Sequence, residues 1–279
     1  MSNIVEALSY GVEFLKKHVS NPKLLAEILL CNILGIKKND LFFKNNKISK
    51  SKFEKFKKVL KRRAANEPVE YIIGYVDFYD TKILVNKDVL IPRVETEILV
   101  DLISKKIEKK GSENKILFDV CTGSGAIGIS LKKRFPNLKV IMSDISKKAL
   151  RVAKKNAKIN KVDVELINGH LLDPFKKKAD YIVCNPPYVS KKEFEKLDKD
   201  VKDYEPKLAL IAGENGLFFY KKFESDVKKY LNSKANLFFE IGSKQKKSIL
   251  KIFSSNFWKN KIVIKDYSGK NRFFFVEIE

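Results

Sequence analysis

The chain has 279 residues, 44% of them hydrophobic, which is enough apolar surface for one large domain or two ordinary ones. Its formal charge of +23 is compatible with a nucleic-acid partner, but only six of the 57 basic residues are Arg, the residue that specific phosphate and base readers favour. A Lys-rich composition of the kind that an AT-rich genome gives explains the charge as well, and no apolar run is long enough to span a membrane.

The cysteine and histidine content argues against a metal site. The three cysteines, Cys31, Cys121 and Cys184, form no Cys-x-x-Cys pair, and only two His accompany them. The beginning of the chain lacks the basic-then-apolar pattern of a signal peptide. We therefore expect a cytoplasmic protein with free thiols, no metal and no membrane association.

Residues 1–70 are predicted to form a small helical bundle. Apolar residues recur at helical spacing in the stretches 4–15, 24–29 and 53–60. Asn21 before Pro22 has the form of an N-cap followed by a first-turn proline, and Ser49 or Ser51 can cap the third helix. The bundle carries no chemical motif, so its expected role is substrate recognition or packing.

Residues 71–92 are predicted to form a β-hairpin that links the bundle to a second domain, because apolar and aromatic residues alternate from Tyr71 to Val85. Pro92 and the acidic residues after it are typical of a helix start.

Residues 93–279 are predicted to form an α/β domain with a parallel sheet, because strand and helix patterns alternate from residue 115 onward. The expected strands cover residues 116–120, 138–143, 164–167, 181–184 and 237–241, followed by a hairpin of residues 262–267 and 273–278.

The turn after the first of these strands carries a glycine-rich loop, Cys121-Thr122-Gly123-Ser124-Gly125, which together with Gly128 matches G-x-G-x-x-G. Asp144 follows the second strand, where an acidic residue can bind a ribose hydroxyl, so a nucleoside cofactor is expected and a dinucleotide is one candidate. Asp119, just ahead of the loop, would repel a pyrophosphate but suits an ammonium group. S-adenosylmethionine fits better, and we expect Asp119, Asp144, Asn185 and loop residues 121–125 to bind it.

The predicted catalytic tip is Asn185-Pro186-Pro187-Tyr188, which follows the apolar strand at residues 181–184. The two prolines make the backbone stiff and extended at a strand end, where ligands bind in open α/β sheets. The Asn185 amide oxygen and the Pro186 carbonyl can both accept hydrogen bonds from one NH2 group. Accepting both protons makes that nitrogen more nucleophilic, and the Tyr188 ring can hold the planar group that carries it.

These motifs resemble those of the protein-(glutamine-N5) methyltransferases that modify peptide chain release factors, the HemK/PrmC family. The resemblance covers essentially the whole chain and includes, besides the two loops, Glu67-Pro68, Leu90-Ile91-Pro92-Arg93, Tyr204-Glu205-Pro206 and Gly216-Leu217.

The resemblance implies a Rossmann-like, seven-stranded S-adenosylmethionine-dependent methyltransferase sheet in the order 3-2-1-4-5-7-6, with the last strand antiparallel and a small N-terminal helical domain. The implied substrate is the glutamine of a Gly-Gly-Gln loop in the release factor. Asn185, Pro186, Pro187, Tyr188 and Arg93 are the residues implied to hold it.

The chain departs from the family pattern at two positions near the cofactor. Cys121 stands where a glycine is common. Leu171 aligns best with the aromatic residue that many members place beside the adenine, so we expect apolar contact in place of stacking. The neighbouring His170 is expected to line the adenine pocket as a polar residue.

Three other readings stay open at this point. An adenine-N6 methyltransferase acting on RNA or DNA shares the Asn-Pro-Pro-Tyr motif and would use the positive charge, although no extra target-recognition domain is evident and Arg is scarce. A non-catalytic module that keeps the cofactor fold and a dinucleotide oxidoreductase are the other two. The favoured reading is a monomeric enzyme with a protein substrate and no obligate nucleic acid.

Overall fold

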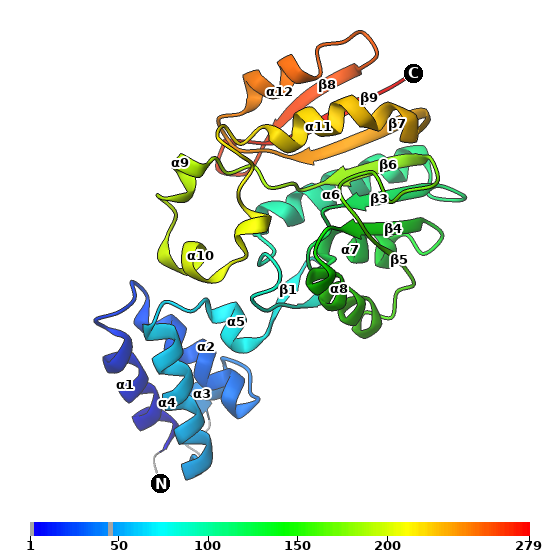
Figure 1. The fold of residues 1–279 in the computed structure, drawn as a ribbon. Coiled ribbons are helices and arrows are strands. Elements are labelled where there is room, and N and C mark those ends of the chain that lie inside the picture. The colour runs from blue at the N-terminus through cyan, green and yellow to red at the C-terminus, as the bar shows by residue number, and fades with distance from the viewer. Residues whose placement is uncertain (1–2, 44–46) are drawn as a thin grey trace. The chain divides into compact units, whose positions relative to one another are not determined.

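The computed structural model describes residues 3–43 and 47–279, which form two compact units (Figure 1). The first unit contains the chain up to Gly74 together with Asp198–Tyr204, and the second contains Tyr75–Leu197 and Glu205–Glu279. Residues 1–2, which begin the segment without a signal-peptide pattern, lie outside the described residues, as do residues 44–46. Within the described ranges, no helix combines the length and the apolar character that crossing a membrane requires.

The first unit is helical. Its elements are α1 (Ile4–Leu15), α2 (Pro22–Leu34), α3 (Asp40–Phe43), α4 (Lys50–Ala64), α5 (Val69–Ile73) and α10 (Lys199–Tyr204). Helices α1, α2 and α4 contact one another around a shared core, and Gly11 allows the close approach, since a Cβ there would lie 2.7 Å from Phe56 Cζ. Ser49 caps α4 by accepting a hydrogen bond from Lys52 N at 3.3 Å. Asn21 is the N-cap of α2 and Pro22 its first residue, as predicted, although the Asn21 side chain makes no capping hydrogen bond.

The second unit begins with an antiparallel hairpin of β1 (Tyr75–Phe78) and β2 (Thr81–Leu84). The other strands are β3 (Ile116–Val120), β4 (Lys139–Asp144), β5 (Glu165–Asn168), β6 (Ala179–Cys184), β7 (Leu231–Glu240), β8 (Lys259–Lys265) and β9 (Asn271–Glu277). They form one sheet in the order β5-β4-β3-β6-β7-β9-β8, in which β9 is antiparallel to both neighbours. Counted along the sheet's own strands this is 3-2-1-4-5-7-6, which confirms the predicted fold class.

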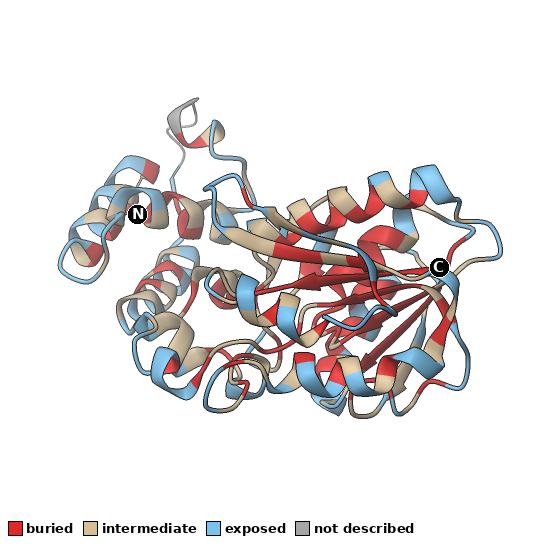
Figure 2. Ribbon diagram, turned by 90° about the horizontal axis from the view of Figure 1, so that it is seen from above, coloured by how far each residue is buried: buried red, intermediate tan, exposed pale blue. Residues whose placement is uncertain are grey.

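Helices cover both faces of this sheet, and Figure 2 shows the buried strands between them. The longer helices are α6 (Val94–Lys110), α7 (Ala126–Arg134), α8 (Lys147–Ile159), α11 (Phe218–Val227) and α12 (Lys246–Ile252), and the short ones are α9 (Lys191–Phe194), η1 (Lys207–Ala209) and η2 (Lys228–Tyr230). Phe118 and Val120 of β3 share a core cluster with Tyr220 and Phe223 of α11. The neighbouring strand residues point to the other face, because side chains alternate along a strand.

The parallel strands end at a common edge, and this places the polar residues at their ends close together. Val120 pairs with Ser143 of β4 and with Cys184 of β6, and Cys184 pairs with Phe239 of β7. The residues that follow these pairs therefore meet at the carboxyl edge of the sheet. Strand β7 begins at Leu231, before the predicted start at residue 237. Its register with β6 shifts between Ala179 and Tyr181, so the two parts of the strand do not pair as one regular ladder.

Candidate active site

A cavity within the second unit opens at the carboxyl ends of β3, β4 and β6. Such strand ends are where open α/β sheets bind ligands. The walls of the cavity come from the loop after β3, the end of β4, the turns after β5 and β6, and the segments that lead into α6 and α11. The lining includes Val89, Pro92, Thr96, Cys121, Thr122, Gly123, Ser124, Ile127, Asp144, His170, Leu171, Asn185, Pro187, Leu208 and Phe219.

Residues 121–124 of the glycine-rich loop line the cavity, whereas Gly125 does not. Cys121 and Gly123 both adopt left-handed backbone angles, with φ of +60° and +56°, and a Cβ on Gly123 would meet nothing within 4 Å. Gly125, with φ +85°, does not line the cavity. A Cβ there would lie 2.8 Å from Ile129 Cδ1, so this glycine is required for packing of the loop against α7.

Asp144, which was predicted to bind a ribose hydroxyl, lies at the end of β4 and lines the cavity. Its Oδ2 accepts a hydrogen bond from Gly123 N at 2.9 Å, and its Oδ1 accepts one from Ser146 N at 2.8 Å. Burial raises the pKa of this carboxyl, and the backbone hydrogen bonds act in the opposite direction. The two N–H donors fix the carboxylate in one orientation, and each oxygen keeps a further lone pair for a ligand.

Asp119 occupies a deeper position. Its side chain is 1% exposed and does not line the cavity. Oδ2 accepts hydrogen bonds from Thr122 Oγ1 at 2.5 Å and Gly128 N at 2.9 Å, whereas Oδ1 is buried with no hydrogen-bond partner among the described residues. Burial raises the pKa of Asp119 to about 7, against the effect of the two hydrogen bonds. Asp119 thus holds the loop and retains one acceptor without a partner.

The cavity wall next to the end of β4 includes apolar side chains and an aromatic residue that the sequence did not reveal. Leu171 and His170, which were predicted to lie beside the adenine, both line the cavity. Phe219 of α11 lines it as well, with its ring centroid 6.4 Å from that of His170. Its only signal in the sequence was membership of an apolar helix face. An aromatic wall for a planar base is therefore present, although it comes from a different element than in the aligned family position.

The tip after β6 places Asn185 and Pro187 in the cavity lining, while Pro186 and Tyr188 lie outside it. Asn185 Nδ2 donates a hydrogen bond to Glu240 Oε2 at 3.1 Å. The Tyr188 hydroxyl donates to Glu240 Oε1, also at 3.1 Å, and burial together with the nearby Glu240 charge raises the pKa of Tyr188. Among the described residues no donor is bonded to Asn185 Oδ1, which leaves this oxygen as an acceptor for a ligand.

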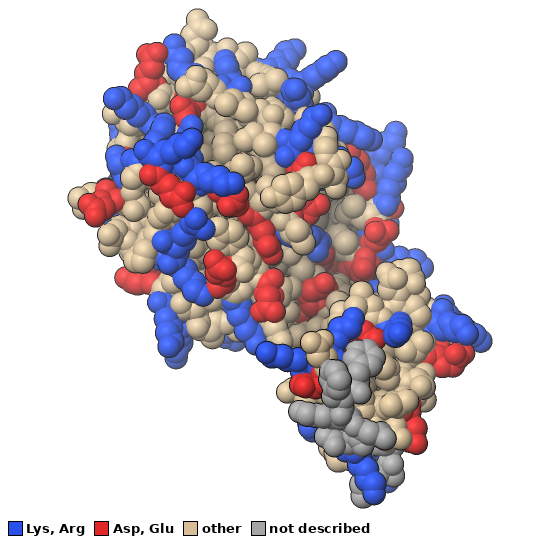
Figure 3. Space-filling view, turned by 180° about the vertical axis from the view of Figure 1, so that it is seen from behind, with Lys and Arg blue, Asp and Glu red and all other residues tan. Residues whose placement is uncertain are grey.

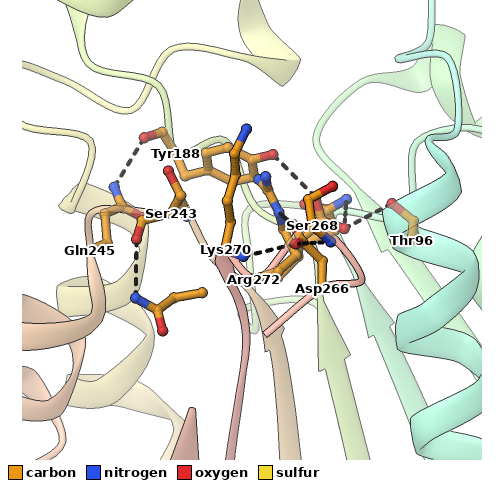
Figure 4. A network of polar contacts seen from close by, with 12 residues as sticks. Thr96, Tyr188, Ser243, Gln245, Asp266, Ser268, Lys270 and Arg272 are labelled. Atoms are coloured by element: carbon orange, nitrogen blue, oxygen red, sulfur yellow. Dashed lines mark hydrogen bonds and ion pairs between the residues drawn. The ribbon is translucent and has the colours of Figure 1, made fainter. Parts of the chain in front are cut away.

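Glu240, the last residue of β7, is the largest omission from the predicted site. Its side chain is buried, and besides Asn185 and Tyr188 it accepts a hydrogen bond from Thr96 Oγ1 at 2.8 Å (Figure 4). Burial raises the pKa of Glu240, and the Thr96 hydrogen bond and the positive charge of Arg272 oppose this effect. No motif surrounds it, and the only sequence signal was an acidic residue that ends a strongly apolar strand.

Arg93, predicted to bind substrate, does not line the cavity. Its guanidinium forms an ion pair with Glu205, whose side chain is 1% exposed, and Glu205 Oε2 also accepts a hydrogen bond from Ile91 N at 3.1 Å. The pair connects the segment before α6 to the segment before η1. Both segments contribute cavity walls, through Pro92 and Leu208, so the geometry gives Arg93 a role in holding those walls.

Comparisons with known proteins agree over the whole chain. The family model "Methyltransferase small domain" matches residues 94–201, and "PrmC N-terminal domain" matches residues 6–74. The release factor glutamine methyltransferase of Bacillus cereus is 36% identical over 99% of both chains. That of Chlamydia trachomatis is 38% identical over 97% of this chain and 90% of its own. A solved methyltransferase from Pyrococcus furiosus, 16% identical, shares the fold with a TM-score of 0.52 over 72% of this chain and 89% of its own.

Proposed function

Because the chain belongs to the family of release factor glutamine methyltransferases, we propose that it transfers a methyl group from S-adenosylmethionine to the side-chain amide nitrogen of a glutamine in a release factor. The observation that carries this proposal is a single cavity that joins Asp144 and Gly123 to Asn185. The first two suit the nucleoside of a methyl donor, and Asn185 presents an oxygen to an NH2 group.

The residues of the cavity fit the cofactor. The Asp144 carboxylate, oriented by two backbone N–H groups, can accept hydrogen bonds from the ribose hydroxyls. Leu171 and Phe219 can enclose the adenine. The unpartnered Asp119 oxygen supplies negative charge near the loop for the ammonium group of the methionine part, directly or through water. When bound, S-adenosylmethionine supplies a methyl group on a positively charged sulfur.

The substrate amide would be held by acceptors alone. Asn185 Oδ1 and the Pro186 carbonyl accept its two N–H protons, which localises the nitrogen lone pair toward the methyl group. Catalysis then comes from positioning and from acceptors that are already in place before the reaction. The nitrogen becomes acidic once it is methylated and releases one proton to water or to the Asn185 oxygen, so no strong base is required.

The finer points of the proposal concern the substrate and its recognition. We assign the target to the Gly-Gly-Gln loop of the release factor. We assign residues 1–70 to its recognition, residues 71–92, which contain the end of α5 and the β1–β2 hairpin, to the link between the domains, and residues 93–279 to catalysis. We place the enzyme in the cytoplasm as a monomer, in keeping with its free cysteines Cys31, Cys121 and Cys184.

The charge distribution on one face of the molecule gives little support to the alternative of an adenine-N6 methyltransferase. On the face shown in Figure 3, Lys and Arg side chains are interspersed with Asp and Glu. A nucleic-acid track would instead concentrate Lys and Arg in one stripe. The Bacillus cereus and Chlamydia trachomatis relatives, which align with nearly the whole chain, also carry names that specify a release factor.

Transfer of labelled methyl from S-adenosylmethionine to a purified release factor tests the proposal. The matched control is the same factor with its Gly-Gly-Gln glutamine replaced by alanine. Label on the unchanged factor only is the expected result. Equal label on both factors would exclude the proposed atom, and label that appears only when RNA or DNA is supplied would favour the adenine reading.

A further inference from the structure

We propose that Glu240 is a positioning residue whose carboxylate fixes the Asn185 amide so that Oδ1, and not Nδ2, faces the substrate. The inference rests on the proposed function, because it concerns how the same site prepares its acceptor. An asparagine side chain has nearly the same shape at its oxygen and its nitrogen end. A site that depends on the oxygen therefore needs a neighbour that recognises the nitrogen.

The sheet register places Glu240 beside Asn185. Cys184 of β6 pairs with Phe239 of the parallel strand β7, so the next residue of each strand, Asn185 and Glu240, comes next at the same edge. The strand register alone thus places Glu240 beside Asn185, and no sequence motif marks the position.

The Glu240 carboxylate determines which end of the Asn185 amide faces it. An ionised carboxylate only accepts hydrogen bonds, so the Asn185 atom that faces it has to be the NH2 group. Thr96 from α6 occupies the same oxygen, Oε2, and Tyr188 occupies Oε1. Donors from separate elements thus bind both carboxylate oxygens. If the Glu240 side chain turned away from Asn185, it would lose these hydrogen bonds.

Hydrogen bonds and charges from several elements act on this carboxylate. Burial raises the pKa of Glu240, and the charge of Glu95 of α6 acts in the same direction. The hydrogen bonds from Thr96 and Tyr188 and the positive charge of Arg272 of β9 favour the ionised form. Arg272 is held in turn by Asp266, whose Oδ2 lies 3.3 Å from its Nε (Figure 4). If the Asn185 amide were reversed, Oδ1 would face the carboxylate oxygens and Nδ2 would face the N–H protons of the substrate amide. Both contacts would then be repulsive, and the lone pair of the substrate nitrogen would not be directed toward the methyl group.

A glutamine at position 240 is the informative conservative change. Its oxygen can take the place of Oε2 and still accept from Asn185 and Thr96. Its NH2 group then faces the Tyr188 hydroxyl, which can rotate and accept, since a hydroxyl is both a donor and an acceptor. Glu240→Gln should therefore keep the Asn185 orientation, whereas Glu240→Met fills a similar volume and offers Asn185 no comparable acceptor.

The experiment measures methyl transfer to the release factor at saturating cofactor, together with the Kd for S-adenosylmethionine, for wild type, Glu240→Gln and Glu240→Met. We expect kcat to fall by about 10²-fold in the methionine variant, the order seen when one preorganised polar contact to the reacting group is lost. The cofactor Kd should stay within about twofold, and the glutamine variant should recover most of kcat.

Tyr220→Phe is the matched control. It removes a buried hydrogen bond to the backbone of the same residue and leaves the carboxylate in place. It should lower the melting temperature without the loss of kcat. If Glu240→Met does not fold, Glu240→Ala, which leaves room for water, replaces it.

Three results would overturn the proposal: full kcat in the methionine variant, equal loss of kcat in the glutamine and methionine variants, or a loss of kcat in Tyr220→Phe as large as in Glu240→Met. A wild-type enzyme that does not label the release factor at all would instead contradict the proposed function.

Discussion

Replacing Asp119 with asparagine should make the cofactor-free protein more stable, and increasingly so as the pH rises. The folded protein raises the pKa of Asp119 from its ordinary value of 3.8 to about 7, because the side chain is buried. At 1.36 kcal/mol for each pKa unit, this difference corresponds to about 4 kcal/mol of destabilisation once the carboxylate is ionised. Asparagine can keep the hydrogen bonds from Thr122 and Gly128 through its amide oxygen.

The sign follows from the direction of the pKa change. A folded-state pKa above the unfolded value means that the folded protein binds the proton more tightly. This contribution to stability is fully present below about pH 4 and is lost as the pH rises toward 7. The free energy of unfolding of Asp119→Asn, relative to that of wild type, should therefore increase by about 2 kcal/mol between pH 5 and pH 7.

Urea unfolding in the absence of cofactor measures this difference. The fluorescence of Trp258, the only tryptophan, reports on the second unit because its side chain is buried in that core. Asp163→Asn, at an exposed position, is the control and should show a difference that does not change with pH. A constant difference for Asp119→Asn between pH 5 and pH 7 would refute the reasoning. If the carboxylate receives the cofactor ammonium group, the same variant should also bind S-adenosylmethionine more weakly.

Three further substitutions separate cofactor binding, chemistry and packing. Asn185→Ala should abolish turnover and leave the cofactor Kd nearly unchanged, and loss of cofactor binding in titration calorimetry would contradict the role of its oxygen. Asp144→Ala should weaken cofactor binding by about 1–3 kcal/mol, because a charged hydrogen-bonding partner is lost; an unchanged Kd would place the ribose elsewhere. Gly125→Ala should lower the free energy of unfolding by about 2 kcal/mol or more, because φ is +85° and the new Cβ would lie 2.8 Å from Ile129 Cδ1. Urea unfolding that matches wild type would show that the loop relaxes freely.

The parts of the fold and site that were predictable depend on local patterns. Asp144, Gly123 and Asn185 stand at strand ends, and the rule that parallel strands share a carboxyl edge was enough to bring them together. The order of the strands was expected from the family resemblance, because hydrophobic alternation predicts strands but does not say which strands are neighbours. Leu171 was likewise placed by alignment with the family pattern.

The missed residues depend on contacts between distant parts of the chain. Glu240 lies 55 positions from Asn185, and Phe219 reaches the cavity from a helix that the sequence marks only as amphipathic. The family resemblance implied that Arg93 holds the substrate, whereas the structure pairs it with Glu205. Its partner Glu205 lies 112 positions away, and no local signal revealed that pairing.

The polar groups along the carboxyl edge of the sheet share one property that suits both the cofactor and the substrate: each supplies an oxygen that accepts hydrogen bonds. Neighbouring strands β4, β3, β6 and β7 each place an oxygen acceptor at or beside their last residue, namely Asp144, Asp119, Asn185 and Glu240. Burial of the three carboxyl groups raises the pKa of each and disfavours their ionised forms in the folded protein. A cofactor with a sulfonium and an ammonium group, and a substrate that offers an NH2 group, are the ligands that such acceptors bind well. The same edge would repel phosphate, so the arrangement favours an amide substrate and a cationic methyl donor over a dinucleotide.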